Sequence, residues 1–385
     1  MSETQKHTKP NVPNLRFPGF EGEWKCNKLS SYLYENKERN RAGEFNKTDV
    51  LSVSGDCGIV NQIELLGRSF AGKSVADYHI VRTGNIVYTK SPLKEYPYGI
   101  VKYNSGKDGI VSTLYAVYHH RENVNGRFVE HYFTSPQRTN RYFKPIVRIG
   151  AKHDMKIGNN EVIDNTVFFP SLDEQNKITE LLDLLDQRIA IQSKVIERYE
   201  SLIKALYRHV MTKFRGCSVR LGDIVQIQKG KQINSEILSC MGPYYVMNGG
   251  ITPSGYYSQF NTEANTISIS EGGNSCGYVQ FNEKPYWSGG HCYSLLYPSP
   301  NVDYRFLFHT LKSRQDDIMA LRIGSGLPNI QKKDIESFNI MLPSLVDQKR
   351  YASIFDALSS RRKMAEQVKS NYEIQKIYLI HNLFI

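Results

Sequence analysis

The most constraining feature of this 385-residue chain is an internal repeat, in which residues 170–206 return with drift at residues 343–379. Each repeated segment follows a β-rich stretch, so the chain is a doubled unit. We predict two similar domains joined by two similar helices, an arrangement that suits a two-part target. Pro170-Ser171-Leu172-Asp173-Glu174-Gln175 matches Pro343-Ser344-Leu345-Val346-Asp347-Gln348, and Asp183, Leu185, Arg188, Tyr199 and Leu206 match Asp356, Leu358, Arg361, Tyr372 and Leu379.

The repeated segments have the pattern of long coiled-coil helices. Residues 172–213 lack Gly and Pro and place apolar side chains at alternating steps of four and three, which is heptad spacing. Ser171 and Glu174 form a capping-box pattern at the start, and Gly216 follows a basic last turn. The expected seam consists of Ile178, Leu182, Leu185, Ile189, Ile196, Tyr199, Ile203, Leu206, Tyr351, Phe355, Leu358, Val368, Tyr372 and Leu379.

A helix of about 40 residues is roughly 60 Å long, so two such helices paired antiparallel would act as a ruler. The second copy interrupts its stripe with Arg361 and Arg362, which suggests that each helix needs the other. The alternative, in which each helix merely caps its own β domain, stays open because a sequence does not show which helices pair.

Short β-type runs separated by Gly, Asn and Pro fill the rest of the chain, at 84–89, 99–103 and 114–118 and again at 265–269, 277–281 and 293–297. The predicted fold class is α+β, with two mixed, mainly β domains, two long antiparallel coiled-coil helices and an internal pseudo-two-fold repeat. The predicted parts are a flexible leader (1–14), a first domain (15–169), a central helix (170–215), a second domain (216–342) and a C-terminal helix (343–385).

Charge and composition favour a polyanionic partner. There are 49 Lys and Arg against 38 Asp and Glu, which gives a net charge of +11. The 25 tyrosines could stack on bases or sugars, although most should be core or strand residues. No apolar run is long enough for a signal peptide or a membrane span, and the six cysteines form no close pair, so we expect a cytoplasmic protein.

One segment matches a nucleotide-binding motif: Gly67-Arg68-Ser69-Phe70-Ala71-Gly72-Lys73-Ser74 fits the P-loop pattern. A P-loop needs a buried strand before it and a substantial helix after it. Only about nine residues separate Ser74 from the turn at Thr83-Gly84. A P-loop enzyme therefore remains an alternative, and the favoured interpretation is a basic loop. No other catalytic pattern is present, and the ten histidines lack metal-ligand spacing, so we expect no catalytic and no metal site.

Polar, basic and aromatic residues recur in turn-like segments at equivalent places in the two β domains. Lys and Arg would hold phosphates, whereas Asn, Gln, Arg and His can read base edges. Solvated surface charge is the alternative for each of them. The candidate DNA-binding residues are Lys37, Arg39, Arg41, Arg68, Lys73, Lys90, Tyr96, Tyr98, Lys152, His153 and Lys156 in the first domain and Lys229, Lys231, Asn248, Tyr256, Tyr257, Asn274, Trp287, His291, Arg322, Ser325, Asn329 and Lys332 in the second.

Together these features resemble the specificity subunit of type I restriction-modification systems, over essentially the whole chain. The resemblance rests on the two Pro-Ser-Leu-x-x-Gln helix entries, on the segments 182–186 and 355–358, and on the loop 322–330. The first half departs from that loop pattern at 150–155.

The resemblance implies a DNA-binding subunit without an active site of its own. Its two target-recognition domains would each read one half of a split double-stranded DNA site, and its helices would set the spacer and dock two methyltransferase subunits. The resemblance places S-adenosylmethionine, ATP and Mg on the methyltransferase and restriction/translocase partners and no cofactor in this chain.

Overall fold

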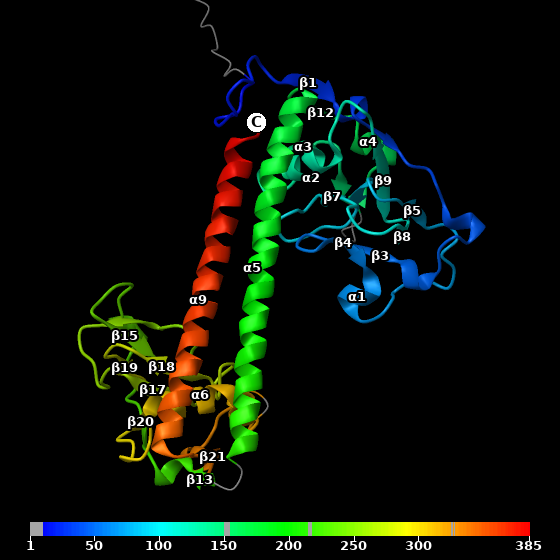
Figure 1. Cartoon of the computed structure of the whole chain (residues 1–385). Helices are drawn as coiled ribbons and strands as arrows, with labels where there is room; N and C mark the ends of the chain where they lie inside the picture. The colour runs from blue at the N-terminus through cyan, green and yellow to red at the C-terminus, as the bar shows by residue number, and fades with distance from the viewer. Residues whose placement is uncertain (1–10, 150–154, 215–217, 325, 327) are drawn as a thin grey trace, which may run out of the picture. The chain divides into compact units, whose positions relative to one another are not determined.

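The computed structural model describes residues 11–149, 155–214, 218–324, 326 and 328–385. The chain forms two compact units: unit 1 comprises residues 1–191 and 369–385, and unit 2 comprises residues 192–368. Two long helices, α5 (Leu172–Lys213) and α9 (Leu345–Asn382), contribute to both (Figure 1). The unit boundaries cut through both helices, so each unit holds one β-rich stretch together with part of each helix.

Unit 1 is built around an antiparallel sheet with the strand order β2-β9-β6-β7. Its strands are β1 (Lys25–Lys28), β2 (Leu33–Glu35), β3 (Leu51–Ser54), β4 (Gly58–Asn61), β5 (His79–Val81), β6 (Ile86–Thr89), β7 (Val101–Tyr103), β8 (Gly109–Val111), β9 (Tyr115–His120), β10 (Arg148–Ile149), β11 (Met155–Lys156) and β12 (Thr166–Phe169). Its short helices are α1 (Gln62–Leu66), α2 (Gly126–Tyr132), α3 (Pro136–Phe143) and α4 (Asn159–Val162).

Unit 2 has a central sheet of the corresponding order, β14-β20-β17-β18, again antiparallel throughout. Its strands are β13 (Ser218–Arg220), β14 (Gln226–Lys229), β15 (Tyr244–Met247), β16 (Gly255–Tyr257), β17 (Thr266–Ser270), β18 (Val279–Asn282), β19 (Trp287–Ser288), β20 (Cys292–Leu296) and β21 (Asn339–Met341), and its short helices are α6 (Tyr304–Ser313), α7 (Gln315–Met319) and α8 (Lys332–Glu336). The six β-type runs expected from the sequence overlap β6, β7, β9, β17, β18 and β20.

The two units repeat one topology. In each, a two-stranded ribbon (β1 with β12, β13 with β21) pairs the strand at the start of the unit with the strand that precedes a long helix. The inner strands β6, β9, β17 and β20 of the central sheets are largely buried on both faces, which explains the apolar run of β6. In β6, for example, Ile86 and Tyr88 pack against the core that contains α2 and α3, and Val87 packs against the β3–β4 hairpin. The predicted fold class is confirmed.

A buried glutamine connects each long helix to the β-rich part of its own unit. In unit 1, Gln175 Oε1 accepts a hydrogen bond from the backbone N–H of Asn125 (3.0 Å), and Asn125 caps α2. In unit 2, Gln348 Oε1 accepts from the backbone N–H of Asp303 (2.7 Å), which caps α6. The Gln348 amide also donates to the carbonyls of Asn301 and Pro343. The repeated Pro-Ser-Leu-x-x-Gln motif is therefore a docking motif between helix and sheet domain.

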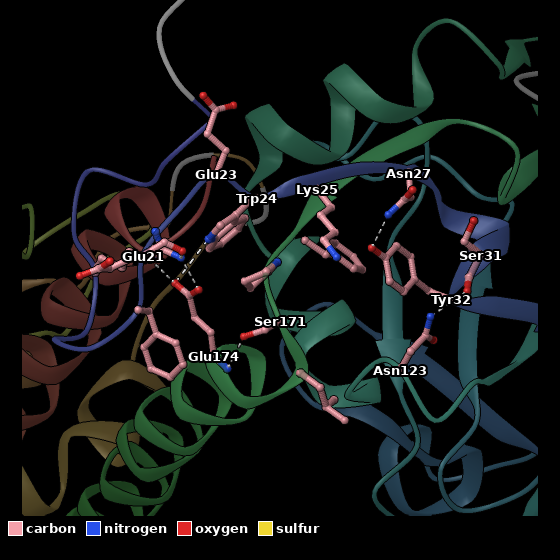
Figure 2. A pocket seen from close by; sticks show the side chains of 15 residues that line it. Glu21, Glu23, Trp24, Lys25, Asn27, Ser31, Tyr32, Asn123, Ser171 and Glu174 are labelled. Atoms are coloured by element: carbon pink, nitrogen blue, oxygen red, sulfur yellow. Dashed lines mark hydrogen bonds and ion pairs between the residues drawn. The ribbon is translucent and has the colours of Figure 1, made fainter.

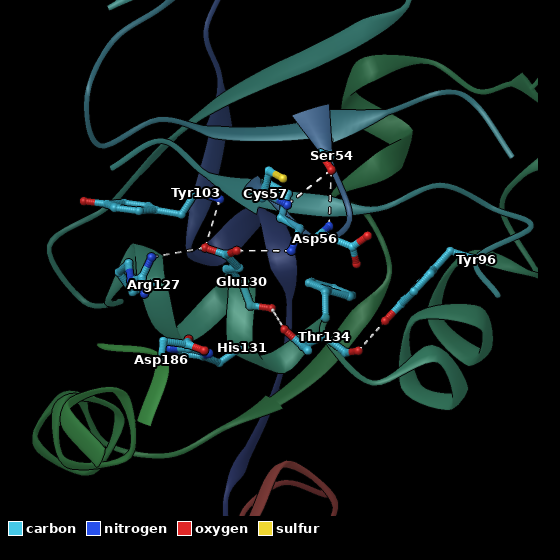
Figure 3. Close-up of polar contacts among 12 residues, drawn as sticks. Ser54, Asp56, Cys57, Tyr96, Tyr103, Arg127, Glu130, His131, Thr134 and Asp186 are labelled. Atoms are coloured by element: carbon cyan, nitrogen blue, oxygen red, sulfur yellow. Dashed lines mark hydrogen bonds and ion pairs between the residues drawn. The ribbon is translucent and has the colours of Figure 1, made fainter. Parts of the chain in front are cut away.

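About two turns further along each long helix, an aspartate makes a second connection of this kind. Asp183 accepts hydrogen bonds from Arg127 Nε (3.0 Å) and His131 Nε2 (2.8 Å) of α2. Asp356 accepts from Arg305 Nη2 (2.6 Å) and His309 Nε2 (2.7 Å) of α6. Figure 3 shows Arg127, Glu130 and His131 along α2, with Asp186 of α5 beside His131. Asp183 and Asp356 occupy matched positions of the repeat, so both units hold their helices by the same interaction.

The helix seam is apolar towards both of its ends. In unit 1, Ile178, Leu182 and Leu185 of α5 join Leu379 and Ile380 of α9 in one core. In unit 2, Val210 packs with Tyr351 and Phe355, and Ile203 and Leu206 lie against them. The start of one helix thus meets the end of the other in each unit, which makes the pair antiparallel. The other α5 seam residues, Ile189, Ile196 and Tyr199, are half-buried.

The middle of α9 departs from the predicted apolar seam. Val368 is 38% exposed, so it lies outside the seam, whereas its neighbour Lys369 is half-buried. Leu358 and Tyr372 are half-buried as predicted seam positions require. Lys376 makes an ion pair with Asp186 (2.5 Å). Long cationic side chains can cover apolar surface with their stems while their heads find acids, and this explains why the apolar pattern alone misplaced Val368.

The N-terminal segment of unit 1 is tied to the start of α5 by an ion pair. Arg16 Nη2 lies 2.7 Å from Glu174 Oε2, and the Glu174 side chain is 2% exposed. The indole of Trp24 donates to the same carboxylate at 3.4 Å, and Figure 2 shows Trp24 and Glu174 on the wall of a pocket beside Ser171. Backbone hydrogen bonds also join Asn11 to Trp24 and Leu15 to Asn382. The first ten residues of the predicted leader lie outside the described residues.

The aspartate connection predicts a pH-dependent contribution to stability. Burial alone would raise the pKa of Asp183, but hydrogen bonds from His131 and Arg127 outweigh it and lower the pKa to about 2. We expect Asp183→Asn to reduce the free energy of unfolding of unit 1 by about 2 kcal/mol at pH 7, measured by urea denaturation. Since the pKa is lowered in the folded state, the difference from wild type should shrink as the pH falls from about 4 towards 2.

The matched control is Glu180→Gln on the same helix, where an exposed carboxylate pairs with Lys177. This change should cost at most about 0.5 kcal/mol. An effect of Asp183→Asn no larger than that of the control at pH 7 would show that the connection does not hold α2 on α5.

Candidate nucleic-acid interface

At one edge of the unit 2 sheet, five loops come together to form what we call the unit 2 rim: residues 229–232, 248–251, 271–275, 289–291 and 322–332 (with 325 and 327 outside the described residues). Backbone hydrogen bonds run from Glu271 N to His291 O (2.9 Å), from Ile330 N to Glu271 O (2.8 Å) and from Lys231 N to Ser288 O (2.8 Å), next to loop 289–291. The loop 248–251 is joined through the side chain of Asn248, which accepts from His291 N (3.3 Å). Five segments far apart in the sequence therefore form one surface.

Glycines allow the loops of the rim to approach closely. A Cβ atom on Gly230 would lie 2.2 Å from the carbonyl oxygen of Gly289 and 2.4 Å from that of Ser288. A Cβ on Gly289 would lie 2.6 Å from Asn248 Oδ1. These distances are shorter than any van der Waals contact, so a side chain at either position would push the loops apart.

A buried acid organises the cations of the rim. Glu271 Oε1 lies 2.6 Å from Lys229 Nζ, and its Oε2 lies 3.7 Å from His291 Nδ1, while its side chain is only 12% exposed. The phenol of Tyr293 donates to the same carboxylate at 3.0 Å. The side chains of Lys229 and His291 are 53% and 60% exposed, and both are paired with the carboxylate of Glu271.

The remaining polar residues of the rim are open to solvent. Lys231, Asn274, Arg322, Asn329 and Lys332 are exposed. Among the described residues, neither Lys231 nor Arg322 makes an ion pair. Lys332 pairs with Glu336 at 3.4 Å. The rim thus presents cations and amides together, which is the combination that holds phosphates and reads base edges.

The predicted aromatic residues of unit 2 stand beside the rim on a three-stranded sheet. Trp287 Nε1 donates to the backbone carbonyl of Lys231 (3.0 Å). The rings of Tyr257 and Trp287 meet edge to face with centroids 5.2 Å apart. Tyr256 precedes Tyr257 on β16, and all three rings are half-buried. They support the Lys231 loop and leave part of each ring open. Asn248 is also half-buried, and its side chain accepts from the backbone of His291 (3.3 Å).

The corresponding edge of unit 1 is held by Lys90. Its ammonium donates to Asn159 Oδ1 (2.6 Å), and the Asn159 amide donates to Glu35 (2.7 Å). Burial lowers the pKa of Lys90. Tyr96 is half-buried and donates to the carbonyl of Thr134 (2.5 Å), as Figure 3 shows. The half-buried Tyr98 accepts from Tyr88 through its backbone carbonyl. Three of the residues predicted from the first domain therefore have internal partners.

Other candidates of unit 1 lie on its surface. Arg39 donates to the carbonyl of Asp77 (2.9 Å), and Arg41 lies 3.8 Å from the Asp77 carboxylate. Lys37 and Lys156 are exposed. The predicted residues Lys152 and His153 in unit 1 and Ser325 in unit 2 lie outside the described residues.

Comparison with known proteins agrees with this arrangement. Residues 217–375 match the family described as the type I restriction modification DNA specificity domain. They include the unit 2 rim and most of α9. The chain contains a type I DNA specificity domain.

Two named relatives of the chain are also type I specificity subunits. A Mycoplasma pneumoniae protein named as a type I specificity subunit is 34% identical over 167 residues, which are 43% of this chain and 44% of that protein. A similarly named Mycoplasma genitalium protein is 32% identical over 157 residues, 40% of each chain. These alignments span less than half the length of the relatives.

The fold of the whole chain is that of specificity subunits. A crystal structure of the type I restriction-modification S subunit from M. genitalium superimposes with a TM-score of 0.69 and 17% identity, covering 97% of this chain and 99% of that one. A structure from a study of complex assembly in the type I system gives a TM-score of 0.52 and 15% identity over 97% of this chain and 99% of that one. The resemblance stated from the sequence is confirmed.

The P-loop alternative finds no support in the geometry. Helix α1 precedes the motif and ends at Gly67 in the left-handed conformation. Residues 67–78 contain no helix, so no helix dipole points at a phosphate position. Lys73 is exposed, and Arg68 stacks over the ring of Phe70 at 4.5 Å.

None of the described helices is long and apolar enough to cross a bilayer.

Sequence reasoning missed the acids and amides that position the cations. Glu271 in the specificity domain and Glu35 in unit 1 were not candidates, because a carboxylate repels phosphate, and Asn159 was not singled out although an amide can contact DNA. The only signal for Glu271 is its place before Gly272-Gly273-Asn274. The donor atoms of His131, Asp183 and Asp186 lie within 4.8 Å of one another, but Arg127 neutralises Asp183, and Ser359 replaces Asp186 at the matched position of the repeat.

The close packing of the rim gives a testable prediction. We expect Gly230→Ala to destabilise unit 2 by about 1–3 kcal/mol, because the added methyl group meets backbone that cannot move away. Gly272→Ala is the matched control in the same rim, since its Cβ would lie 3.5 Å from the nearest atom. Urea denaturation followed by the fluorescence of Trp287 measures both. Equal stability of the two variants would contradict the close approach of loops 229–232 and 289–291.

Proposed function

We propose that this chain is the DNA-recognition subunit of a type I restriction-modification complex, in which unit 1 and unit 2 each read one half of a bipartite DNA site. The observation that carries the proposal is the repeated topology: each unit holds a sheet domain docked on the start of one long helix, and the end of the other long helix packs there. Two related domains with different loops suit an asymmetric split site. The target-recognition domains are residues 15–169 and 216–342, and the helices are 170–215 and 343–385.

In this function the unit 2 rim would contact DNA in two ways. Lys231 and Arg322 are exposed cations that can hold phosphates, and such contacts position the protein on the duplex. Asn274, His291 and Asn329 have the side-chain types that read base edges in the major groove. The surface of unit 1 would contribute Lys37, Arg39, Arg41 and Lys156, with Arg68 and Lys73 available for phosphate contacts.

In such a complex, the partner subunits would carry out the catalysed reactions. The chain would recognise DNA in the cytoplasm, while methyltransferase subunits bring S-adenosylmethionine and restriction/translocase subunits bring ATP and Mg. Exposed apolar side chains on the long helices support docking of partner helices. Leu184 and Ile191 of α5 are 50% and 57% exposed, and Met364 and Ile374 of α9 are 65% and 63% exposed. Apolar residues at heptad-like spacing on an outer face are suited to packing against further helices.

Phosphate contacts at the rim can be tested by salt dependence. We expect Lys231→Ala with Arg322→Ala to weaken duplex binding by the assembled methyltransferase complex and to reduce the salt slope of binding by about 2, since two counterion-releasing contacts are lost. Lys363→Ala, an exposed cation of α9, is the control and should leave the slope unchanged. His291→Ala should relax the preference at one half-site only. An unchanged slope in the double variant would remove the rim from the DNA interface.

The helix pair should set the gap between half-sites. Adding four residues to α5 and four to α9 in the mid-section of the pair lengthens it by about 6 Å, which corresponds to about two base pairs of DNA. Mapping methylated adenines in a host genome should then show a longer spacer between unchanged half-sequences. Changed half-sequences at an unchanged spacer would refute the role of the helices as a ruler.

A further inference from the structure

A cavity in unit 2 is lined by residues that do not belong to the rim. Its volume is about 630 Å³, and its walls come from the second part of α5, from α6 and α7, and from the first part of α9. This size is within the range of pockets that hold small ligands. Its apolar wall includes Ile203 and Phe308, and charged side chains line the rest of it.

Four of the residues that line the cavity are Lys or Arg, and two are acids. Lys204 and Arg208 stand one turn apart on α5, and neither makes an ion pair among the described residues. Like charges at this spacing destabilise a helix slightly. Arg362 is paired more loosely: its Nη1 lies 4.0 Å from Glu200 and its Nε lies 3.4 Å from Glu366, without hydrogen-bond geometry at Nε. The cavity therefore carries an excess of positive charge.

The fourth cation, Lys312, is largely withdrawn from water. Its ammonium donates to the carbonyl of Val279 (2.8 Å) and to Gln315 Oε1 (2.8 Å). Burial, with a contribution from Arg362, lowers the pKa of Lys312 to about 8. An anion in the cavity would offset this cost, because an opposite charge favours the ammonium form.

The internal repeat shows that helix pairing does not require these charges. At the offset of the long helices, 173 residues, Ile377 matches Lys204, His381 matches Arg208 and Ile189 matches Arg362. Thr134 matches Lys312 when α2 is aligned with α6 through His131 and His309. Unit 1 thus packs the same helix crossing with three uncharged residues and a histidine. The cations of unit 2 need another explanation.

We propose that this cavity binds a small organic anion, with phosphate or carboxylate groups held by Lys204, Arg208, Lys312 and Arg362 and an apolar or planar body lying against Phe308 and Ile203. Arginine and lysine form charge-assisted hydrogen bonds with such groups. An aromatic ring and an aliphatic side chain suit a planar body. The site is independent of the DNA-contacting rim and of the P-loop-like segment.

Titration calorimetry of the full chain with ATP and with pyrophosphate tests the proposal. We expect saturable binding of both, with ATP binding several-fold more tightly because its base contacts the apolar wall. Lys204→Gln with Arg208→Gln should weaken both by about tenfold or more, since each lost charge-assisted hydrogen bond weakens binding substantially. These two side chains are exposed, so the fold should survive their replacement.

The matched control is Lys194→Gln with Arg198→Gln, an exposed pair with the same residue types and spacing on the same helix. This pair does not line the cavity and should leave binding unchanged. Equal weakening by both double variants, or absence of saturable binding by the wild type, would overturn the proposal. Equal affinity for ATP and pyrophosphate would overturn the contact with an apolar wall. Loss of ATP binding in Lys73→Ala would instead place the anion at residues 67–74.

Discussion

The rest of the structure depends on the way in which each long helix is anchored to a sheet domain by buried, fully paired polar groups. Gln175 and Gln348 are completely buried, and each bonds the residue that caps a short helix of its unit, α2 in unit 1 and α6 in unit 2. Unpaired, such a group would cost about 1–3 kcal/mol, so the bond specifies one orientation of helix against sheet. The aspartates further along, Asp183 and Asp356, add a second point of attachment. Two points of attachment define a direction, which a single apolar contact would not.

Within each unit, different residues anchor the long helix and form the loops at the sheet edge. The polar groups at the helix are conserved between the two halves of the chain, whereas the loops at the sheet edge are not: Glu271 anchors cations in unit 2, and Lys90 is itself anchored by Asn159 in unit 1. A protein that reads two different half-sites needs this combination of a common frame and different surfaces. The cation-lined cavity of unit 2 is a further difference between halves that otherwise share one topology.

Sequence patterns predicted the repeat, the long helices and the central strands, because each depends on local periodicity. These patterns predicted the helix seam less well in the middle of α9, where charged side chains lie next to the seam. Val368 fits the apolar spacing but is exposed, and the adjacent Lys369 is half-buried. For the candidate DNA-contacting residues, residue type indicated chemistry but not direction. Tyr96 and Lys90 have suitable side chains, yet their polar atoms bond to Thr134 and Asn159.

By itself, the sequence determined that the molecule has two related halves, each with a sheet domain followed by a long helix, because duplication and heptad spacing are properties of order along the chain. Only the tertiary structure decided which residues form a common surface. The rim of unit 2 gathers five loops drawn from residues 229 to 332, and their approach depends on backbone hydrogen bonds and on the missing side chain of Gly230. Contacts between residues so far apart follow from packing, which local patterns do not encode.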